Sequence, residues 1–480
     1  MTDRFDVIVI GGGSAGLVSS GILAGLGARV AVVEKDDLGG ECLFTGCVPS
    51  KALIAAAASR HAAGRAPDHG LPPVEMKAVD FRSVRAAIGE AIDAVYSGPE
   101  ALLEEGVEEV LIGRPRFVDT GSIDVEGRRL RARRFVLCTG SRPRLPDLPG
   151  LDGVPFLTSR SVLELDRLPD RLAIVGTGPV GCEMAQVFRR LGSRVTLLGR
   201  STGLLPRDDP ELTQLLLEQF LEEGIVVLPE TEAAEVSQGA RGEIAIHARR
   251  RGEDMRIQAD ALLLAVGRSP NVEDLGLERV GVEYGPGGIT VDRHLRTTAR
   301  NVWALGDVTG LTPFSHMAEA QARAVARHIG LGIPASFDLG QRVWGTFTDP
   351  ELARVGLDEE SARRVHRRVE VLRLDLSEID RAQADKRLRG RAKIVVAGWR
   401  GKVVGAHLLA PHAGELIQEW ILACRHGLRI DQVSNAVHVY PSWSMLNQRA
   451  ADTRFRGWGR SPRWRGWARR IHAWTSPLRR

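Results

Sequence analysis

Two cysteines, Cys42 and Cys47, stand with four residues between them in a glycine-rich segment that ends at Lys51. A thiol pair can exchange two electrons by forming and breaking a disulfide bond. The pair follows shortly after a Gly-x-Gly-x-x-Gly motif that begins at Gly11, and so predicts two-electron redox chemistry beside a bound nucleotide. The alternative is half of a zinc site. No nearby cysteine or histidine completes the four ligands that zinc usually takes, so we predict no metal site.

The glycine motif occurs twice, each time between an apolar run typical of a buried strand and a segment typical of a helix. The first glycine permits a tight turn, the second lets the backbone approach a pyrophosphate, and the third allows close packing of helix on strand. The following helix offers free N–H groups to the phosphates, and an acid after the next strand accepts hydrogen bonds from ribose hydroxyls. The copies predict two dinucleotide sites, the first at Gly11, Gly13, Ser14, Ala15, Gly16 and Glu34, the second at Gly176, Gly178 and Gly181.

Length and composition indicate a multidomain protein from a reducing compartment. A chain of 480 residues exceeds the size at which a single core keeps growing, and 43% hydrophobic residues with 53 glycines fit a loop-rich α/β protein. Five cysteines without evenly spaced pairs argue against a secreted disulfide scaffold, and Cys138, Cys182 and Cys424 read as small core residues. We find no signal peptide and expect no apolar stretch long enough to span a bilayer, so we expect a cytoplasmic location.

Several motifs together identify a family. The chain resembles the flavoprotein disulfide reductases, which include dihydrolipoamide dehydrogenase, glutathione reductase and mercuric reductase. The resemblance covers residues 4 to about 450. It rests on the two glycine motifs, the Cys-x4-Cys-x-Pro-Ser-Lys segment, Ala-Val-Gly-Arg-Ser-Pro-Asn at 265–271 and Trp-Ala-Leu-Gly-Asp-Val at 303–308.

The resemblance implies an α/β fold with two Rossmann-like dinucleotide-binding domains, one for FAD and one for NAD(P), and an α+β C-terminal dimerisation domain. That domain would complete the partner subunit's active site in a homodimer. The resemblance also adds Thr139, Gly140, Gly267, Gly306 and Asp307 to the cofactor sites, with Asp307 on the ribityl chain. We expect the FAD domain at 1–148 and 269–338, the NAD(P) domain at 149–268, the dimerisation domain at 339–452 and a basic tail at 453–480.

The family pattern assigns different roles to the two cysteines. Electrons would pass from the nicotinamide through the flavin to the pair, with Cys47 in charge-transfer contact with the flavin and Cys42 as the thiol that meets the substrate. The residues around Cys47 support the role assigned to it, because Cys47 precedes a helix predicted at 49–60 with Pro49 in its first turn. The dipole of that helix lowers the pKa of a nearby thiol.

Lys51 also favours a redox site at the cysteine pair. The chain has only six lysines against 59 arginines, so a lysine at this position is selective. The family places it at the flavin, paired with the glutamate here at Glu183, where a charged pair can stabilise negative charge on the reduced flavin. The alternative is an ordinary ion pair between helices.

The second glycine motif favours NADPH. NAD sites usually carry an acid after the second strand for the ribose 2′-OH, but this strand ends in Leu198-Gly199-Arg200. Arg200 resembles the arginine that NADPH-using members direct at the 2′-phosphate, and Arg207 could assist. NADH is the alternative, in which Arg200 is merely solvated.

The largest departure from the family lies near residue 440. Disulfide reductases carry a His-Pro-x-x-x-Glu motif whose histidine protonates the leaving thiol, but here Tyr440 replaces the histidine and Met445 the glutamate. A tyrosine is a poor base at neutral pH, although it can donate a proton or a hydrogen bond. His438 would share a face with Tyr440 on an extended strand and could substitute for the missing histidine. The motif is closer to that of mercuric reductases, but no cysteine follows Cys424.

Residues 453–480 hold nine arginines, four tryptophans and no acid, which leaves the rest of the chain mildly acidic despite a net charge of +5. Trp464, Trp467, Ile471 and Trp474 would form one stripe of a helix, a pattern typical of a helix lying on the inner membrane surface. The alternative is a helix that packs this stripe on the protein itself. Specific nucleic-acid binding is not expected, because no recognised module accompanies the arginines.

These observations lead to one main hypothesis and two alternatives. The main hypothesis is an NADPH-dependent FAD oxidoreductase, similar to mercuric reductase, that reduces a metal ion, a quinone or an unusual disulfide through Cys42. The second is a dihydrolipoyl dehydrogenase with an altered acid–base pair. The third, of another class, is a membrane-docked protein that supplies electrons to a partner.

Overall fold

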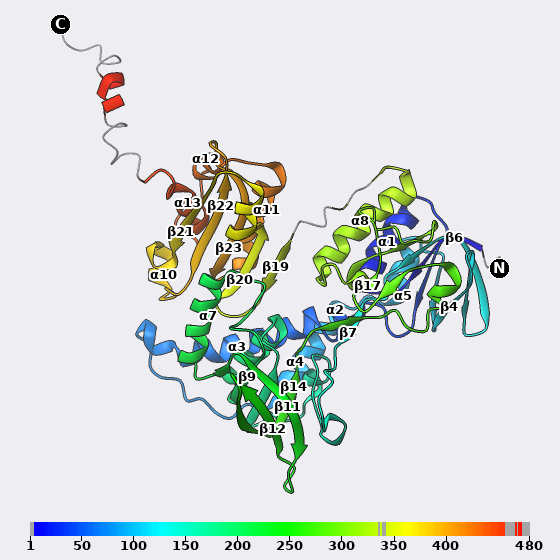
Figure 1. The fold of residues 1–480 in the computed structure, drawn as a ribbon, viewed down its shortest axis with the longest axis horizontal. Helices are drawn as coiled ribbons and strands as arrows, with labels where there is room; N and C mark the ends of the chain where they lie inside the picture. The colour runs from blue at the N-terminus through cyan, green and yellow to red at the C-terminus, as the bar shows by residue number, and fades with distance from the viewer. Residues whose placement is uncertain (1–3, 335–336, 338–341, 457–465, 468, 473–480) are drawn as a thin grey trace. The chain divides into compact units, whose positions relative to one another are not determined.

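The structure is a computed structural model that describes residues 4–334, 337, 342–456, 466–467 and 469–472. The chain forms two compact units, residues 1–204 with 220–340 and residues 205–219 with 341–480 (Figure 1). The first unit contains two mainly parallel sheets and the second an antiparallel sheet with helices. The predicted fold class is confirmed, whereas the domain boundaries at residues 148, 268, 338 and 452 stay predictions.

The first sheet is built around strand β1, a continuous apolar run that is buried on both faces. Ile8 and Ile10 pack into one apolar cluster, and Val7 and Val9 pack into another on the opposite face. Strand β6 pairs with β1 on one side, and on the other with β5 near its start and β18 at its end. The strand order is β3 (Glu109–Ile112), β2 (Val30–Glu34), β1 (Arg4–Ile10), β6 (Arg128–Leu137), β5 (Ser122–Val125) and β4 (Pro115–Asp119), with β18 (Val302–Ala304) on β6.

Helices cover this sheet and lead to the cysteine segment. Helices α1 (Ser14–Gly25) and α8 (Ser315–Leu331) pack together and share the cluster that contains Val7 and Val9. After β2 come α2 (Gly40–Phe44), α3 (Cys47–Gly64), a 3-10 turn η1 (Ala66–His69), α4 (Phe81–Asp93) and α5 (Gly98–Glu104). Helix α3 begins at Cys47 itself, two residues before the predicted start. Ser50 N–H bonds Gly46 O at 3.0 Å, and Pro49 is tolerated within the first turn.

The second sheet is parallel in the order β10 (Val226–Leu228), β9 (Arg194–Leu198), β8 (Arg171–Val175) and β14 (Ala261–Leu264), with α6 (Pro179–Leu191) after β8. An antiparallel sheet of β11 (Thr231–Gln238), β12 (Ile244–Arg250) and β13 (Glu253–Ala259) shares its apolar cluster. Two short pairs, β7 (Ser141–Pro143) with β15 (Arg268–Pro270) and β16 (Tyr284–Gly285) with β17 (Gly288–Ile289), complete the first unit, with 3-10 turns η2 (Leu151–Gly153), η3 (Ser161–Glu164), η4 (Leu277–Val280) and η5 (Gly306–Thr309).

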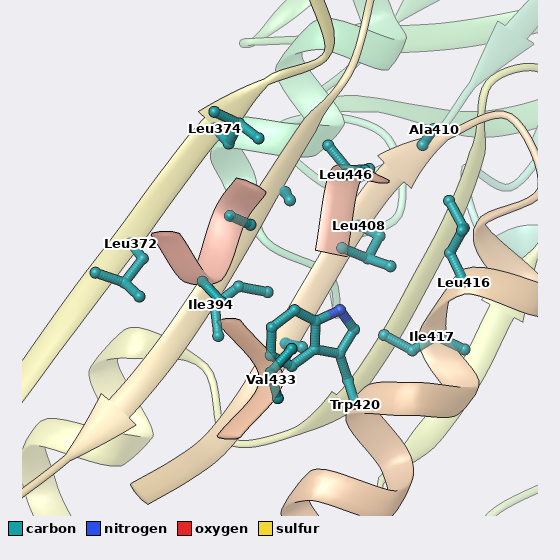
Figure 2. Close-up of a cluster of buried hydrophobic side chains, with 14 of the residues drawn as sticks. Leu372, Leu374, Ile394, Leu408, Ala410, Leu416, Ile417, Trp420, Val433 and Leu446 are labelled. Atoms are coloured by element: carbon teal, nitrogen blue, oxygen red, sulfur yellow. The ribbon is translucent and has the colours of Figure 1, made fainter. Parts of the chain in front are cut away.

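The second unit is an antiparallel sheet with one apolar face. The order is β19 (Val343–Thr346), β20 (Glu351–Gly356), β23 (Lys402–Ala410), β22 (Arg391–Ala397) and β21 (Val369–Asp375). Helices α11 (Ala413–His426), α12 (Ile430–Ser434) and α13 (Met445–Asp452) cover that face, where the side chain of Trp420 is fully buried (Figure 2). Helices α9 (Glu359–Val365) and α10 (Asp380–Ala384) and the turn η6 (Leu376–Glu378) join the strands.

The opposite face of this sheet is buried but charged. Lys393, Arg354 and His407 lie on neighbouring strands, and each is almost fully buried. The residues before α7 (Pro210–Glu222) compensate the two cations: Lys393 pairs with Asp209 at 2.8 Å, and Arg354 donates to the carbonyl of Arg207 at 2.8 Å. Buried charges need such partners, which explains why residues 205–219 belong to this unit.

Two of the expectations concern contact with a membrane. The expectation of no apolar stretch with the length of a membrane span is wrong for residues 40–64, a segment of 25 residues in which an 18-residue stretch has a mean hydropathy of 1.4. This alanine-rich segment packs against α4 and α6, and core helices of such composition meet the same criterion. The predicted tail stripe lies largely outside the described residues, although Trp467 and Ile471 are described and exposed.

Candidate active site

The two glycine motifs adopt the same geometry. Gly11 has φ +104° and Gly176 φ +123°, values that strongly favour glycine, and an added Cβ would lie 2.3 Å and 2.2 Å from the carbonyl oxygens of Cys138 and Ala265. The helices that follow, α1 and α6, have no side-chain cap and no acid in the first turn. Their free N–H groups and positive dipole ends suit a pyrophosphate.

Glu34 ends β2 beside the first glycine turn. Its buried carboxylate accepts hydrogen bonds from the N–H groups of Gly12 at 2.6 Å, Lys35 at 2.7 Å and Asp36 at 3.0 Å. These bonds hold Glu34 at the turn, where the motif predicts a ribose.

Three distant segments meet beside the first sheet. Thr139 and Asn271 exchange two hydrogen bonds, and Asn271 N–H also donates to Gly140 O at 3.0 Å. Asp307 accepts from Ser141 Oγ at 2.5 Å. The structure thus brings Thr139, Gly140, Gly267, Gly306 and Asp307 to connected segments, as cofactor binding from both parts of the chain requires.

The residues present fit a flavin dinucleotide on three observations. The glycine turn leaves no room for side chains, α1 begins uncapped, and the hydroxyls of Thr45 and Thr312 are buried without a partner among the described residues. Buried hydroxyls usually have partners, so a polar ligand that reaches these two would satisfy them.

The two cysteines lie on consecutive helices. Cys42 is on α2 and half-buried, whereas Cys47 opens α3 and is more exposed. The two sulfurs share a hydrogen bond, which lowers the pKa of Cys42 to about 6 and raises that of Cys47. Lys51 and Ser315 counter the rise at Cys47. The reduced pair therefore holds one negative charge near neutral pH, shared between the sulfurs, and resists losing the second proton.

Lys51 forms the predicted ion pair. Its Nζ lies 3.1 Å from Glu183 Oε2, and Glu183 is buried on α6. The pair joins α3 to α6 one turn beyond Cys47 and places a positive charge near the thiols. Its role toward a flavin stays a prediction.

Sequence reasoning missed two residues at the thiols. Ser315 Oγ lies 3.2 Å from Cys47 Sγ, and no local signal could have identified a residue so distant in the sequence. Glu41 directly precedes Cys42 and forms ion pairs with Arg160, at 2.8 Å, and with Arg268. A lone acid within the glycine-rich cysteine segment was a signal that could have found Glu41.

In the second unit, His438 and Tyr440 occupy opposite environments. The His438 ring is buried, with Nε2 at 3.1 Å from both Glu419 oxygens and Nδ1 at 3.0 Å from Ala436 O. Tyr440 is 63% exposed, and no strand forms at residues 437–440. The expectation that the two share a face is wrong, because Glu419 draws His438 inward and engages the nitrogen that a base would need.

Arg200 follows β9, as the NADPH hypothesis requires. Its side chain is 82% exposed, and its one ion pair given by the described residues is a long 3.8 Å contact with Glu232. An exposed guanidinium at this strand end is free to meet a phosphate. Arg207 belongs to the second unit, and its assistance stays a prediction.

The pKa shifts predict selective alkylation. In the reduced protein, iodoacetamide should modify Cys42 first, at a rate that falls about tenfold per pH unit below pH ~6, because only the thiolate reacts. Cys138 and Cys424 should stay unmodified, since burial raises the pKa of each to about 12. Peptide mass spectrometry across pH measures this, and equal labelling of Cys42 and Cys424 at pH 7 would contradict it.

A dithiol at a helix start, beside two glycine-turn dinucleotide sites, defines a redox protein that works with nucleotide cofactors. Residues 5–324 match the family model "Pyridine nucleotide-disulphide oxidoreductase", and residues 343–450 match the dimerisation domain of the same family. The chain belongs to the pyridine nucleotide-disulphide oxidoreductases.

Relatives agree along nearly the whole chain. A mercuric reductase of Streptomyces lividans is 36% identical over 462 residues, covering 94% of this chain and 96% of that protein. A dihydrolipoyl dehydrogenase of Chlamydia pneumoniae is 32% identical and covers 92% and 95%. The solved Cu(II) complex of the HOCl-induced flavoprotein disulfide reductase RclA from Escherichia coli has 26% identity and a TM-score of 0.83, covering 94% of this chain and 99% of RclA.

Family membership confirms several predictions. The protein is an enzyme, a flavoprotein oxidoreductase that uses FAD and NAD(P)H with a disulfide redox centre. Its dimerisation domain supports a homodimer. The roles of individual site residues stay predictions.

Proposed function

We propose that this enzyme passes electrons from NADPH through FAD to Cys42 and Cys47, and from Cys42 to a small acceptor, with a soft metal ion favoured over a quinone or an unusual disulfide. Bound FAD supplies two-electron transfer between the nicotinamide and the dithiol. We place the reaction in the cytoplasm, where thiols are kept reduced.

The observation that carries the proposal is a reactive dithiol without the family's histidine. Disulfide reduction requires a proton for the leaving thiol, which the histidine supplies in the resembled reductases. Here Tyr440 stands at that position, and both ring nitrogens of His438 are engaged. A soft metal ion needs no such proton, because thiolates bind it directly.

Relatives support the same choice of acceptor. Mercuric reductases at 34% and 36% identity act on mercuric ion by name, and the solved RclA structure is a Cu(II) complex. A dihydrolipoyl dehydrogenase activity is the second candidate, favoured by the Chlamydia pneumoniae relative.

An acceptor screen tests the proposal. Purified enzyme is assayed with Hg(II), Cu(II), a quinone, lipoamide and glutathione disulfide, each with NADPH and with NADH. We expect a metal ion to be reduced at least ~10-fold faster than either disulfide, since the missing acid–base group is worth about 10²–10⁴-fold in rate. We also expect NADPH to be preferred over NADH. Lipoamide turnover equal to or above that of every metal ion would overturn the proposal.

The variant Tyr440→His with Met445→Glu sharpens the screen. It restores the family's acid–base residues and should raise lipoamide turnover by about 10-fold or more without raising metal-ion turnover. Tyr440→Phe is the matched control, because it removes the hydroxyl without adding a base. Unchanged lipoamide turnover in the double variant would show that the missing residues do not set the choice of acceptor.

A further inference from the structure

The hydroxyl of Ser315 contacts a sulfur atom and does not cap its own helix. It is the first residue of α8, and its Oγ lies 3.2 Å from Cys47 Sγ. Serines at helix starts commonly cap the free N–H groups, but here Phe314 is the N-cap and no side chain caps α8. The hydroxyl is therefore directed at the redox pair.

Three helix starts meet at this pair. Helix α3 begins at Cys47, α8 at Ser315, and α1 at Ser14, which also hydrogen bonds to Cys42. None of the three helices has an acid in its first turn. Helix N-termini carry partial positive charge, so their convergence favours a negative charge on the sulfurs. The Ser315 hydroxyl lowers the pKa of both cysteines.

We propose that Ser315 is a positioning residue that holds the thiolate of the reduced pair by donating its O–H to the sulfur of Cys47. The inference rests on the proposed redox role of the cysteines but not on the identity of the acceptor. Reduction of the disulfide takes up two electrons and one proton, breaks the S–S bond, and leaves one thiol and one thiolate. The charge is shared between the two sulfurs, and in the form that places it on Cys47 the Ser315 hydroxyl donates a charge-assisted hydrogen bond, which is about twice as strong as a neutral one.

The test is a titration of the reduced holoenzyme. Iodoacetamide labelling of Cys42 and Cys47 is followed by mass spectrometry across pH for wild type, Ser315→Ala and Ser315→Thr. Loss of a hydrogen bond to a charged group should move the thiolate titration about one pH unit higher in Ser315→Ala. Ser315→Thr keeps a hydroxyl and should restore the wild-type profile. Ser50→Ala is the matched control, because Ser50 Oγ bonds the carbonyl of Cys47 rather than its sulfur.

Each outcome decides the question. A shift in Ser315→Ala with rescue by Ser315→Thr supports the proposal. An unchanged profile in Ser315→Ala overturns it, and so does an equal shift in Ser315→Thr. If Ser315→Ala does not fold, Ser315→Gly, which also lacks the hydroxyl, takes its place in the comparison. Labelling does not depend on turnover, so failure of every acceptor in the screen would leave this result readable.

Discussion

Cys47→Ser is expected to abolish the long-wavelength absorbance band that NADPH gives the wild-type enzyme, and to lower turnover by on the order of 10³-fold or more. The band requires a thiolate beside the flavin, and Cys47 has the helix start, Ser315 and Lys51 around its sulfur. Serine keeps the size of the side chain but carries no charge at neutral pH. Anaerobic titration with NADPH, followed by visible spectroscopy, measures the band.

Cys42→Ser separates the two roles. It should keep the band, because Cys47 remains, but lose turnover to a similar extent since the exchange thiol is gone. Cys424→Ser is the control for thiol loss elsewhere and should keep both the band and turnover. A band that persists in Cys47→Ser and vanishes in Cys42→Ser would reverse the assignment. Plain reduced flavin in the wild type would remove the disulfide from the mechanism altogether.

Trp420→Ala is expected to destabilise the second unit by about 3–5 kcal/mol, the usual result of removing a buried tryptophan. Trp420 is fully buried between the sheet and the helices, among Leu408, Ile394 and Val433 (Figure 2). Its Nε1 also donates to Asn447 Oδ1 at 2.7 Å. Because a multidomain chain does not unfold in two states, hydrogen exchange at β22 and β23 is the appropriate measurement.

Two variants calibrate this result. Trp420→Phe fills most of the volume but leaves Asn447 Oδ1 without its donor, so a smaller loss of about 1–3 kcal/mol is expected. Trp399→Ala removes a tryptophan that is 83% exposed and stacked with Arg368, and should lower the opening free energy by no more than about 1 kcal/mol. Equal protection of β22 and β23 in Trp420→Ala and Trp399→Ala would contradict the assigned core.

Local rules explain what could be predicted. Only glycine fits at Gly11 and Gly176, because φ is positive there and an added Cβ would lie 2.2–2.3 Å from a carbonyl oxygen. The motif can therefore be identified from the sequence alone. The buried run of β1 likewise follows from its apolar residues alone. The pairing of Lys51 with Glu183 came from family resemblance rather than from the residues themselves, and the structure forms it at 3.1 Å.

Long-range packing explains which features could not be predicted from the sequence. His438 was expected to share a face with Tyr440, which assumed a strand. In the structure these residues join no sheet, and Glu419, from a helix earlier in the chain, sets the direction of the His438 ring. No periodicity in the sequence encodes such a contact.

The sequence by itself determined the cofactor turns, the dithiol and the missing histidine, because each depends on residue types at short spacing. The tertiary structure decided the environment of the thiols. Ser315 reaches Cys47 because α8 packs on α1, and His438 is directed at Glu419 while Tyr440 is exposed. A redox pair of cysteines can be identified from residues close in the sequence, whereas the negative charge that the pair can hold depends on groups that folding brings near the sulfurs.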